Sequence, residues 1–190
     1  MTNYNIAELS SKLGFTERFF LTRENGSRAY PLLKEQLTRI SKSEAFVLNF
    51  PPNQLIDSSF ADETIIRLGE EILEGKIKDQ ALLLQGLTED SITNIESIIS
   101  LRNLKLAFLA VEPNKQWRCI GHLDPSLKEV LEILADSDYL TAPQLAESHN
   151  LAINNASNRL KRLYDRGLIR REYEVSEKGL QYIYYFWQWT

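Results

Sequence analysis

Apolar residues along the first two thirds of the chain alternate between continuous runs and helical spacing. The continuous runs are "AFVLNF" at residues 45–50, "ALLLQGL" at 81–87 and "LKLAFLAV" at 104–111. Runs of this kind are typical of strands that are covered on both faces. Residues 54–75 and 88–103 lie between them and carry apolar residues at helical spacing behind capping residues. The alternation predicts parallel strands with helical crossovers, in a layered α/β domain.

The flanks of these runs predict further elements. Ile6, Leu9 and Leu13 predict a short opening helix that Gly14 ends. Residues 18–22 are expected to form a strand, 24–26 a turn and 27–40 a helix. Residues 117–120 are expected to add a short strand. Ser59 and Asp62 are spaced as the capping box of the helix that follows the first apolar run.

The pattern changes after residue 124, where helical segments follow one another closely. Residues 127–135, 142–147 and 154–166 each predict a helix, and two short strands are expected around residues 170–175. An aromatic helix is expected to begin at residues 176–179. The change predicts two domains, residues 1–123 and 124–190.

Residues 141–166 have the pattern of a helix-turn-helix. Thr141 is placed to cap a first helix, and Leu145 lies on the face expected to be buried. After the turn "HNLA", the residues Ala156, Leu160 and Leu163 form one apolar stripe of a second helix. The outer face of that helix is therefore free to enter a major groove.

The outer face carries residue types that suit duplex DNA. Asparagine can bond adenine N6 and N7, arginine can bond guanine, and lysine and serine can bond phosphate oxygens. From this face and the following wing we predict a DNA-binding set of Asn154, Asn155, Ser157, Asn158, Arg159, Lys161, Arg162, Arg170 and Arg171. The asparagines are expected at base edges, and the cations nearer the phosphate backbone.

Net charge says little about nucleic acid, but the distribution of charge does. The chain carries −4, and residues 1–123 (14 basic, 16 acidic) and 124–190 (8 basic, 10 acidic) each carry −2. Residues 154–171 hold six basic residues and a single acid, Asp165. A local positive stripe of this kind favours phosphate contacts.

The last third of the chain resembles the winged-helix domain of MarR-type and ArsR-type bacterial regulators. The resemblance is carried by "QLA", the basic helix, "GLIRR" and "VSEKG", in that order. It implies a regulator that reads double-stranded DNA, with a short wing at residues 168–175. The alternative is a winged helix that binds protein, with a merely solvated basic face.

Residues 18–111 resemble the STAS-like domains, relatives of the anti-sigma-factor antagonists. The segment "IDSSFADE" carries this resemblance. It implies a protein partner, and a phosphorylation site at Ser58 or Ser59 whose added charge would block partner binding. The alternative is that these residues only cap a helix.

Several protein classes are disfavoured by what the sequence lacks. Cys119 is the single cysteine, and there is no leader-like N-terminus and no apolar run of membrane-spanning length, so we expect a cytoplasmic protein without membrane contact. His122 and His149 are the two histidines, and no glycine-rich phosphate loop occurs. We therefore expect no metal, no cofactor and no enzyme activity.

The terminus "LQYIYYFWQWT" is rich in aromatic rings. As a helix it would pack back on the chain or form a homodimer. The sequence as a whole predicts a bacterial DNA-binding transcription regulator. The rival hypotheses are a protein-protein interaction adaptor of a signalling or defence system without direct DNA binding, and an enzyme with converging acids in a polar pocket.

Overall fold

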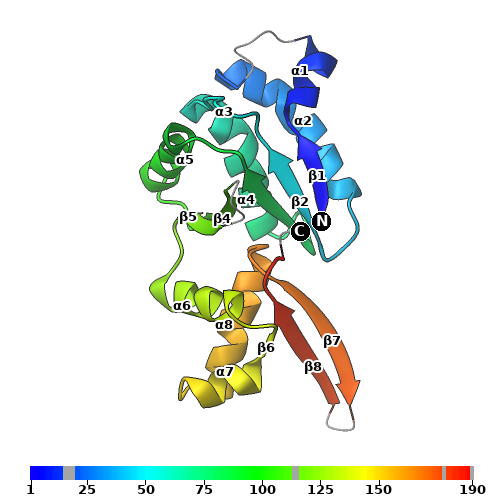
Figure 1. The fold of residues 1–190 in the computed structure, drawn as a ribbon, viewed down its shortest axis with the longest axis vertical. Helices are drawn as coiled ribbons and strands as arrows, with labels where there is room; N and C mark the ends of the chain where they lie inside the picture. Colours follow the sequence, from blue (N-terminus) through cyan, green and yellow to red (C-terminus); the bar gives the residue numbers. More distant parts are fainter. Residues whose placement is uncertain (15–19, 113–115, 177–178, 189–190) are drawn as a thin grey trace. The chain divides into compact units, whose positions relative to one another are not determined.

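The computed structural model describes residues 1–14, 20–112, 116–176 and 179–188. The chain divides into two compact units, Met1–His122 and Leu123–Thr190. Each unit has its own sheet, and each is described by itself (Figure 1).

The first unit is built on a five-stranded sheet with its strands in sequence order. The strands are β1 (Thr2–Asn5), β2 (Glu44–Asn49), β3 (Gln80–Gln85), β4 (Ala107–Val111) and β5 (Trp117–Gly121). The first four are parallel, and β5 pairs antiparallel with β4. The three apolar runs are therefore the central strands, which confirms the α/β pattern.

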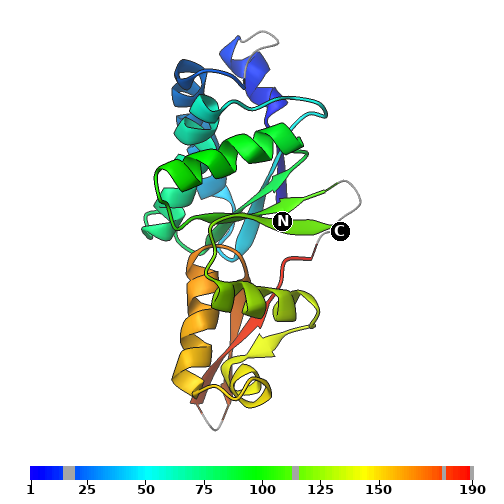
Figure 2. The ribbon, with the colours of Figure 1, turned by 90° about the vertical axis from the view of Figure 1, so that its left-hand side faces the viewer.

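The helices of this unit connect the parallel strands. They are α1 (Ala7–Leu13), α2 (Arg23–Arg39), α3 (Ser58–Ala61), η1 (Asp62–Ile66), α4 (Arg67–Leu73) and α5 (Glu89–Leu101). Since parallel crossovers are right-handed, successive steps in one direction across a sheet place their helices on the same face. In Figure 2 the helices α2 to α5 lie together on one side of the strands. Phe46, Leu48 and Phe108 of the sheet pack with Phe60 and Ile95 of the helices in one buried cluster.

The N-terminal predictions need correction. The predicted strand at residues 18–22 lies partly outside the described residues, and Phe20, Leu21 and Thr22 are not in a strand. The expected turn at 24–26 is helical, because α2 begins at Arg23 under a cap from Thr22. Gly26 serves close packing, since a Cβ there would lie 2.8 Å from the Cβ of Glu63. β1 was not predicted because "TNYN" is short and largely polar.

The segment that carries "IDSSFADE" is one helical stretch containing a π-helical turn, η1. Its N-cap is Asp57, so the predicted capping box of Ser59 and Asp62 is wrong. One carboxylate oxygen of Asp57 accepts from the backbone N–H of Phe60 at 2.7 Å, and the other accepts from that of Thr22 at 2.8 Å. Asp57 therefore caps one helix and also holds the residue that caps α2.

We expect Asp57→Ala to destabilise the first unit by about 2 kcal/mol, because it removes a helix cap and a second charge-assisted hydrogen bond. Asp57→Asn keeps an acceptor for one of the two N–H groups and is expected to recover part of the loss. Urea denaturation, with hydrogen exchange of α2 and α3 as the local readout, measures both. Unchanged exchange in α2 would contradict the bridging role of the carboxylate.

The second unit combines three helices with a three-stranded antiparallel sheet. Its elements are α6 (Pro125–Ala135), β6 (Leu140–Thr141), α7 (Ala142–Ser148), α8 (Ile153–Asp165), β7 (Arg170–Ser176) and β8 (Gly179–Tyr185). The strand order is β6-β8-β7. The three predicted helices are confirmed within two residues at each end.

The aromatic terminus is a strand, so the predicted last helix is wrong. Within β8, Tyr182, Tyr184 and Tyr185 pair across to β7, and Tyr184 is buried while Tyr182 is exposed. Aromatic and β-branched residues suit a pleated strand, and burial along β8 increases from its outer end toward its base instead of following helical spacing. The wing is consequently a hairpin of two seven-residue strands, and the prediction of a short wing is also wrong.

Candidate nucleic-acid interface

The first helix of the candidate interface, α7, is fixed at its start by a reciprocal cap. The Thr141 hydroxyl accepts from the backbone N–H of Gln144, and the Gln144 side chain accepts from the backbone N–H of Thr141 at 2.8 Å. Asn150 adopts a left-handed φ of 49° in the turn that follows. Leu145 on the inner face of α7 is fully buried, as predicted, whereas Leu151 in the turn is half-buried. The local sequence thus specifies the cap of α7 and its buried face.

The second helix, α8, separates an apolar stripe from a polar face. Ala156, Leu160 and Leu163 are each 0% exposed, which confirms the predicted stripe. The opposite face is exposed and carries Asn154, Asn155, Ser157, Asn158, Lys161 and Arg162. In Figure 1, α8 lies beside α6 and α7 within its unit.

The cations of α8 are held by acids of the same unit. Arg162 is paired with Asp124, which precedes α6. Lys161 lies 2.5 Å from Asp165, one turn along α8. The structure therefore presents these two cations already partnered, and a phosphate would have to compete for them.

Arg159 lies differently from its neighbours on α8. Its side chain is 20% exposed and is directed to Glu129 on α6, with 3.7 Å between the charged atoms. Its Nε also donates to the Asn155 side chain at 3.1 Å. This places Arg159 between α8 and α6, at the edge of the outer face.

The wing arginines lie at the base of the hairpin. The guanidinium of Arg171 lies 3.9 Å from the ring centre of Tyr164 and 4.4 Å from that of Tyr182. Burial opposes its charge, yet attraction to Tyr164 and a hydrogen bond with Tyr184 raise the pKa of Arg171 above its ordinary value. Arginine stacked on rings in this way stabilises a fold as readily as it binds a ligand.

Arg170 is held on the other face of the hairpin base. It stacks on Tyr185 at 4.2 Å and pairs with Glu172 at 2.5 Å. The sequence predicted Arg170 and Arg171 at the tip or flank of the wing. The structure places both at its base, because β7 continues for five residues beyond them.

Three uncharged side chains on the outer face of α8 have the fewest internal contacts. Within the described residues, the side chains of Asn154, Ser157 and Asn158 form no hydrogen bond, and all three are exposed. Ile153 stands beside them at the start of α8 and is 54% exposed. These side chains can offer both donors and acceptors to a ligand without first breaking an internal contact.

Sequence reasoning missed the acids that screen α8. Asp124 and Glu129 are separated in sequence from their partners by 38 and 30 residues. No local pattern links such positions, because the contact depends on how α6 packs against α8.

Ser58 and Ser59, the candidate modification site, are the first two residues of α3. Both are half-buried, and their backbone carbonyls accept from the N–H of Asp62. The cap itself comes from the preceding residue, Asp57. The two serines are therefore placed at a helix start, as the sequence predicted.

The first unit contains a cavity of about 220 Å³ at the carboxyl ends of β3 and β4. Its charged lining residues are Glu89, Glu112 and Arg118. Arg118 donates to Glu89 at 2.7 Å and lies 4.0 Å from Glu112. The two acids thus flank an arginine, which is an arrangement of ion pairs and not of two converging carboxyl groups.

Two features are absent from the described part of the chain. No group of three or more histidine, cysteine, aspartate or glutamate residues there is arranged to hold a metal ion. None of its helices is both long enough and apolar enough to cross a membrane.

The second unit therefore has the architecture of a winged helix-turn-helix: a capped α7, a tight turn, an amphipathic α8 and a β-hairpin wing. The MarR family model matches residues 124–178, which include α6, α7, α8 and β7. This match supports the MarR part of the resemblance, and with it a winged helix in this region. DNA binding and transcription regulation are the role of that family. The STAS-like resemblance of the first unit has no such match. No curated protein matches the chain.

Proposed function

We propose that the protein is a DNA-binding transcriptional regulator whose winged helix reads double-stranded DNA through α8. The observation that carries this proposal is the exposed amide face of α8, which stands opposite a fully buried stripe in a unit similar to the MarR family. A helix of this kind, set by a tight turn on a preceding helix, suits the major groove.

Each residue of the proposed interface has a role. Asn154, Asn155 and Asn158 are proposed to meet base edges, where an asparagine amide can bond adenine with both of its polar atoms. Ser157 and Lys161 are proposed to meet phosphate oxygens. Their positions along one face of α8 support this assignment.

The arginines are proposed to act in two ways. Arg159 would exchange Glu129 for a DNA phosphate, and Arg162 would exchange Asp124 for another. The new phosphate contact would replace the ion pair that each arginine gives up. The ring contacts of Arg170 and Arg171 would hold the base of the wing in place. From there, both arginines would reach only those DNA phosphates that lie near the base of the hairpin.

The first unit is proposed to be a STAS-like domain that recruits a partner in the cytoplasm. Its parallel strands in sequence order and the helix start at Ser58 and Ser59 support this proposal. A phosphate on either serine would add charge at the N-terminal end of a helix, beside the carboxylate of Asp57.

A second candidate function is a protein-interaction adaptor without direct DNA binding. The observation that favours it is the internal pairing of the α8 cations, together with the acids Glu172 and Glu174 on the wing. Both features weaken attraction for phosphate relative to a free basic face.

Selection of bound sequences from random duplex DNA by the full chain separates the two functions. The regulator predicts an enriched motif and an affinity that falls steeply with salt, because cations on the protein release counterions from DNA. The adaptor predicts no enriched motif, and this outcome would overturn the proposal.

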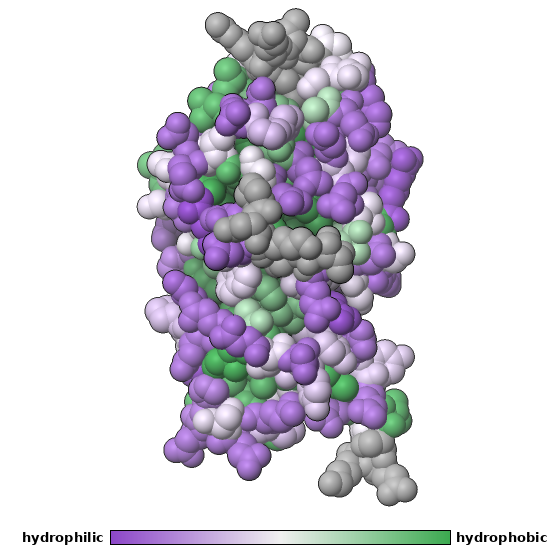
Figure 3. Space-filling view, viewed as in Figure 1, coloured by the Kyte–Doolittle hydropathy of each residue, from purple (hydrophilic) through white to green (hydrophobic). Residues whose placement is uncertain are grey.

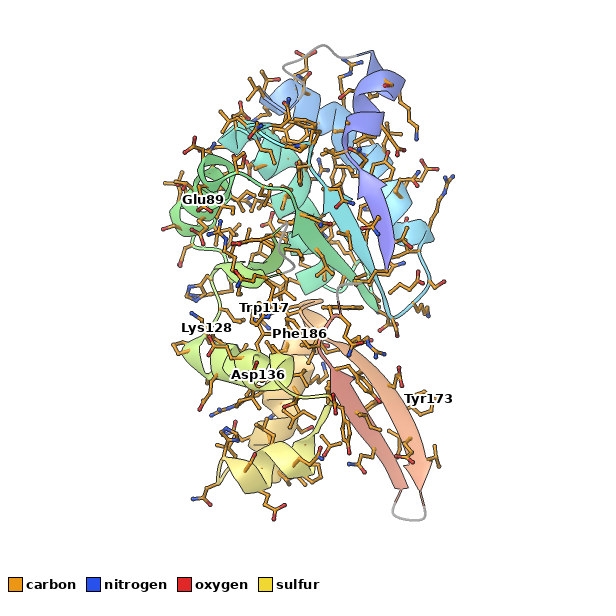
Figure 4. All side chains as sticks on the ribbon, in the orientation of Figure 1. Glu89, Trp117, Lys128, Asp136, Tyr173 and Phe186 are labelled. Atoms are coloured by element: carbon orange, nitrogen blue, oxygen red, sulfur yellow. The ribbon has the colours of Figure 1, made fainter. Side chains whose placement is uncertain are left out.

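The ion pair of Arg162 with Asp124 gives a prediction of increased affinity. Asp124→Asn is expected to strengthen duplex binding about two- to fivefold at low salt, because the partnered guanidinium becomes available to phosphate. Fluorescence anisotropy of a labelled duplex measures it. Asp136→Asn changes net charge equally at an exposed position at the end of α6 (Figure 4) and should leave affinity nearly unchanged. Equal effects of the two variants would show a net-charge effect only.

A further inference from the structure

The start of α8 differs from the starts of four other helices in this chain. The helices α2, α3, α5 and α7 each begin behind a threonine or aspartate whose side chain accepts a hydrogen bond from the helix backbone. The residue in the same position before α8 is Ala152, which has no side-chain acceptor. Because a polar cap stabilises a helix start, the sequence gives up stability at this position.

The first residue of α8 is also unusual. Ile153 is a large aliphatic residue, yet it is 54% exposed. Hydrophilic residues predominate on the face of the molecule that Figure 3 shows. A single exposed apolar residue is common on a protein surface, but this one lies directly beside the missing cap. Two departures from local preference at adjacent residues are typical of a functional site.

The position of these two residues indicates a role at the bases of DNA. When the second helix of a helix-turn-helix enters the major groove, its N-terminal residues are the ones that reach base edges. In α8 these residues are Ile153 and Asn154, with Ala152 directly before them. Ala152 and Asn154 are exposed as well, so this end of the helix is accessible to a ligand.

The chemistry of isoleucine limits what it can recognise on a base pair. Its side chain has no hydrogen-bonding group, and the apolar group that base pairs offer in the major groove is the C5-methyl of thymine. An aliphatic side chain packed on that methyl removes both surfaces from water. A polar cap in place of Ala152 would put a hydrated group beside this contact, and its burial would cost free energy.

We propose that Ile153 reads the C5-methyl group of a thymine in the major groove. The proposal rests on the function proposed for α8 and adds a specificity-determining residue to it. Ala152 keeps a polar side chain away from the methyl contact, which accounts for the missing cap. Since the neighbouring Asn154 suits adenine, A·T pairs are the preferred pairs at the start of α8.

Uracil in place of thymine tests the contact, because this exchange removes only the methyl group from the DNA. The duplex is the one that the full chain selects, and each of its thymines is replaced singly. We expect at least one position at which uracil weakens binding about three- to fivefold, as the burial of one methyl group predicts. Fluorescence anisotropy of the labelled duplexes measures the change.

The variant Ile153→Ala shows whether Ile153 makes this contact. It should bind the thymine and uracil duplexes with affinities that differ by less than about twofold, because the contact is already lost. Any effect of uracil on the shape of the duplex is common to both proteins and cancels in the comparison. Ile153→Ala should fold normally, since the residue is exposed and alanine favours a helix, and thermal denaturation checks this.

Leu101→Ala is the matched control. It removes an aliphatic side chain that is 88% exposed on α5 of the first unit, and it should keep the full sensitivity to uracil.

The outcomes separate this inference from the function on which it rests. An enriched motif without thymine, or with no thymine that is sensitive to uracil, would overturn the inference and leave DNA reading by α8 intact. Equal sensitivity in the unchanged chain and in Ile153→Ala would also overturn it, because another group would then contact the methyl. Failure to enrich any motif would overturn the proposed function itself, and this inference with it.

Discussion

The double variant Asn158→Ala with Lys161→Ala is expected to bind its selected duplex roughly 100-fold more weakly than the unchanged chain. Asn158 is exposed on the outer face of α8, with no side-chain hydrogen bond within the described residues to lose on substitution. A bidentate amide contact to a base contributes about 1–3 kcal/mol, and a phosphate contact adds about 1 kcal/mol. Anisotropy titrations with the selected duplex at two salt concentrations measure the loss and the change in salt dependence.

The two substitutions are separable by their effects. Lys161→Ala alone should weaken binding to all duplexes and reduce the salt slope by about 1, whereas Asn158→Ala alone should relax preference at one base pair. Lys128→Ala removes an exposed lysine from α6 (Figure 4) and is the matched control. If Lys128→Ala weakens binding as much as Lys161→Ala does, α8 is not the reading element.

The second unit was largely predictable from sequence, because its decisive signals are local. Thr141 and Gln144 are three residues apart and form the cap that this spacing predicts. Ala156, Leu160 and Leu163 recur at helical spacing and are all buried. The outer face of α8 follows directly from that stripe.

The strands of the wing, and the groups that pair with its arginines and with those of α8, could not be predicted from local patterns. Apart from Gln181, the segment Leu180 to Tyr185 is apolar or aromatic, a pattern that fits a helix or a strand, and only pairing with β7 decides between them. The partner of Arg162 is Asp124, just before α6, and the partners of Arg171 are rings on α8 and β8. Such contacts depend on tertiary packing, so a count of basic residues overestimates the positive charge that α8 presents.

In the first unit, the sequence predicted the central strands and the edge strand β5, and missed the other edge strand, β1. The runs at 45–50, 81–87 and 104–111 are apolar because consecutive side chains of these strands are buried on both faces, and this continuous burial can be recognised from the sequence. The short β1 has one buried side chain, Tyr4, and carries no comparable signal. The need for glycine at position 26 was not visible in the sequence either, since it depends on the close approach of α2 to the helix that begins at Ser58.

Gly86→Ala is expected to destabilise the first unit by about 3 kcal/mol or more. Gly86 follows β3 with a φ of +81°, and a Cβ there would lie 2.4 Å from the backbone oxygen of Phe50. The left-handed conformation alone disfavours alanine by about 1 kcal/mol. The collision adds to this, because relieving it would strain the neighbouring hydrogen bond from Phe50 N–H to the oxygen of Gln85, which is 2.8 Å long.

Gly14→Ala separates the two causes. Gly14 has a similar φ of +68°, but a Cβ there would meet nothing within 4 Å, so its variant should show only the conformational loss of about 1 kcal/mol. Calorimetry of the full chain gives the overall change, and hydrogen exchange assigns it, since β2 and β3 should lose protection while α8 keeps it. Equal losses at Gly86 and Gly14 would mean that the strand ends move apart at little cost. The close approach of β2 and β3 would then contribute nothing to the stability of the sheet.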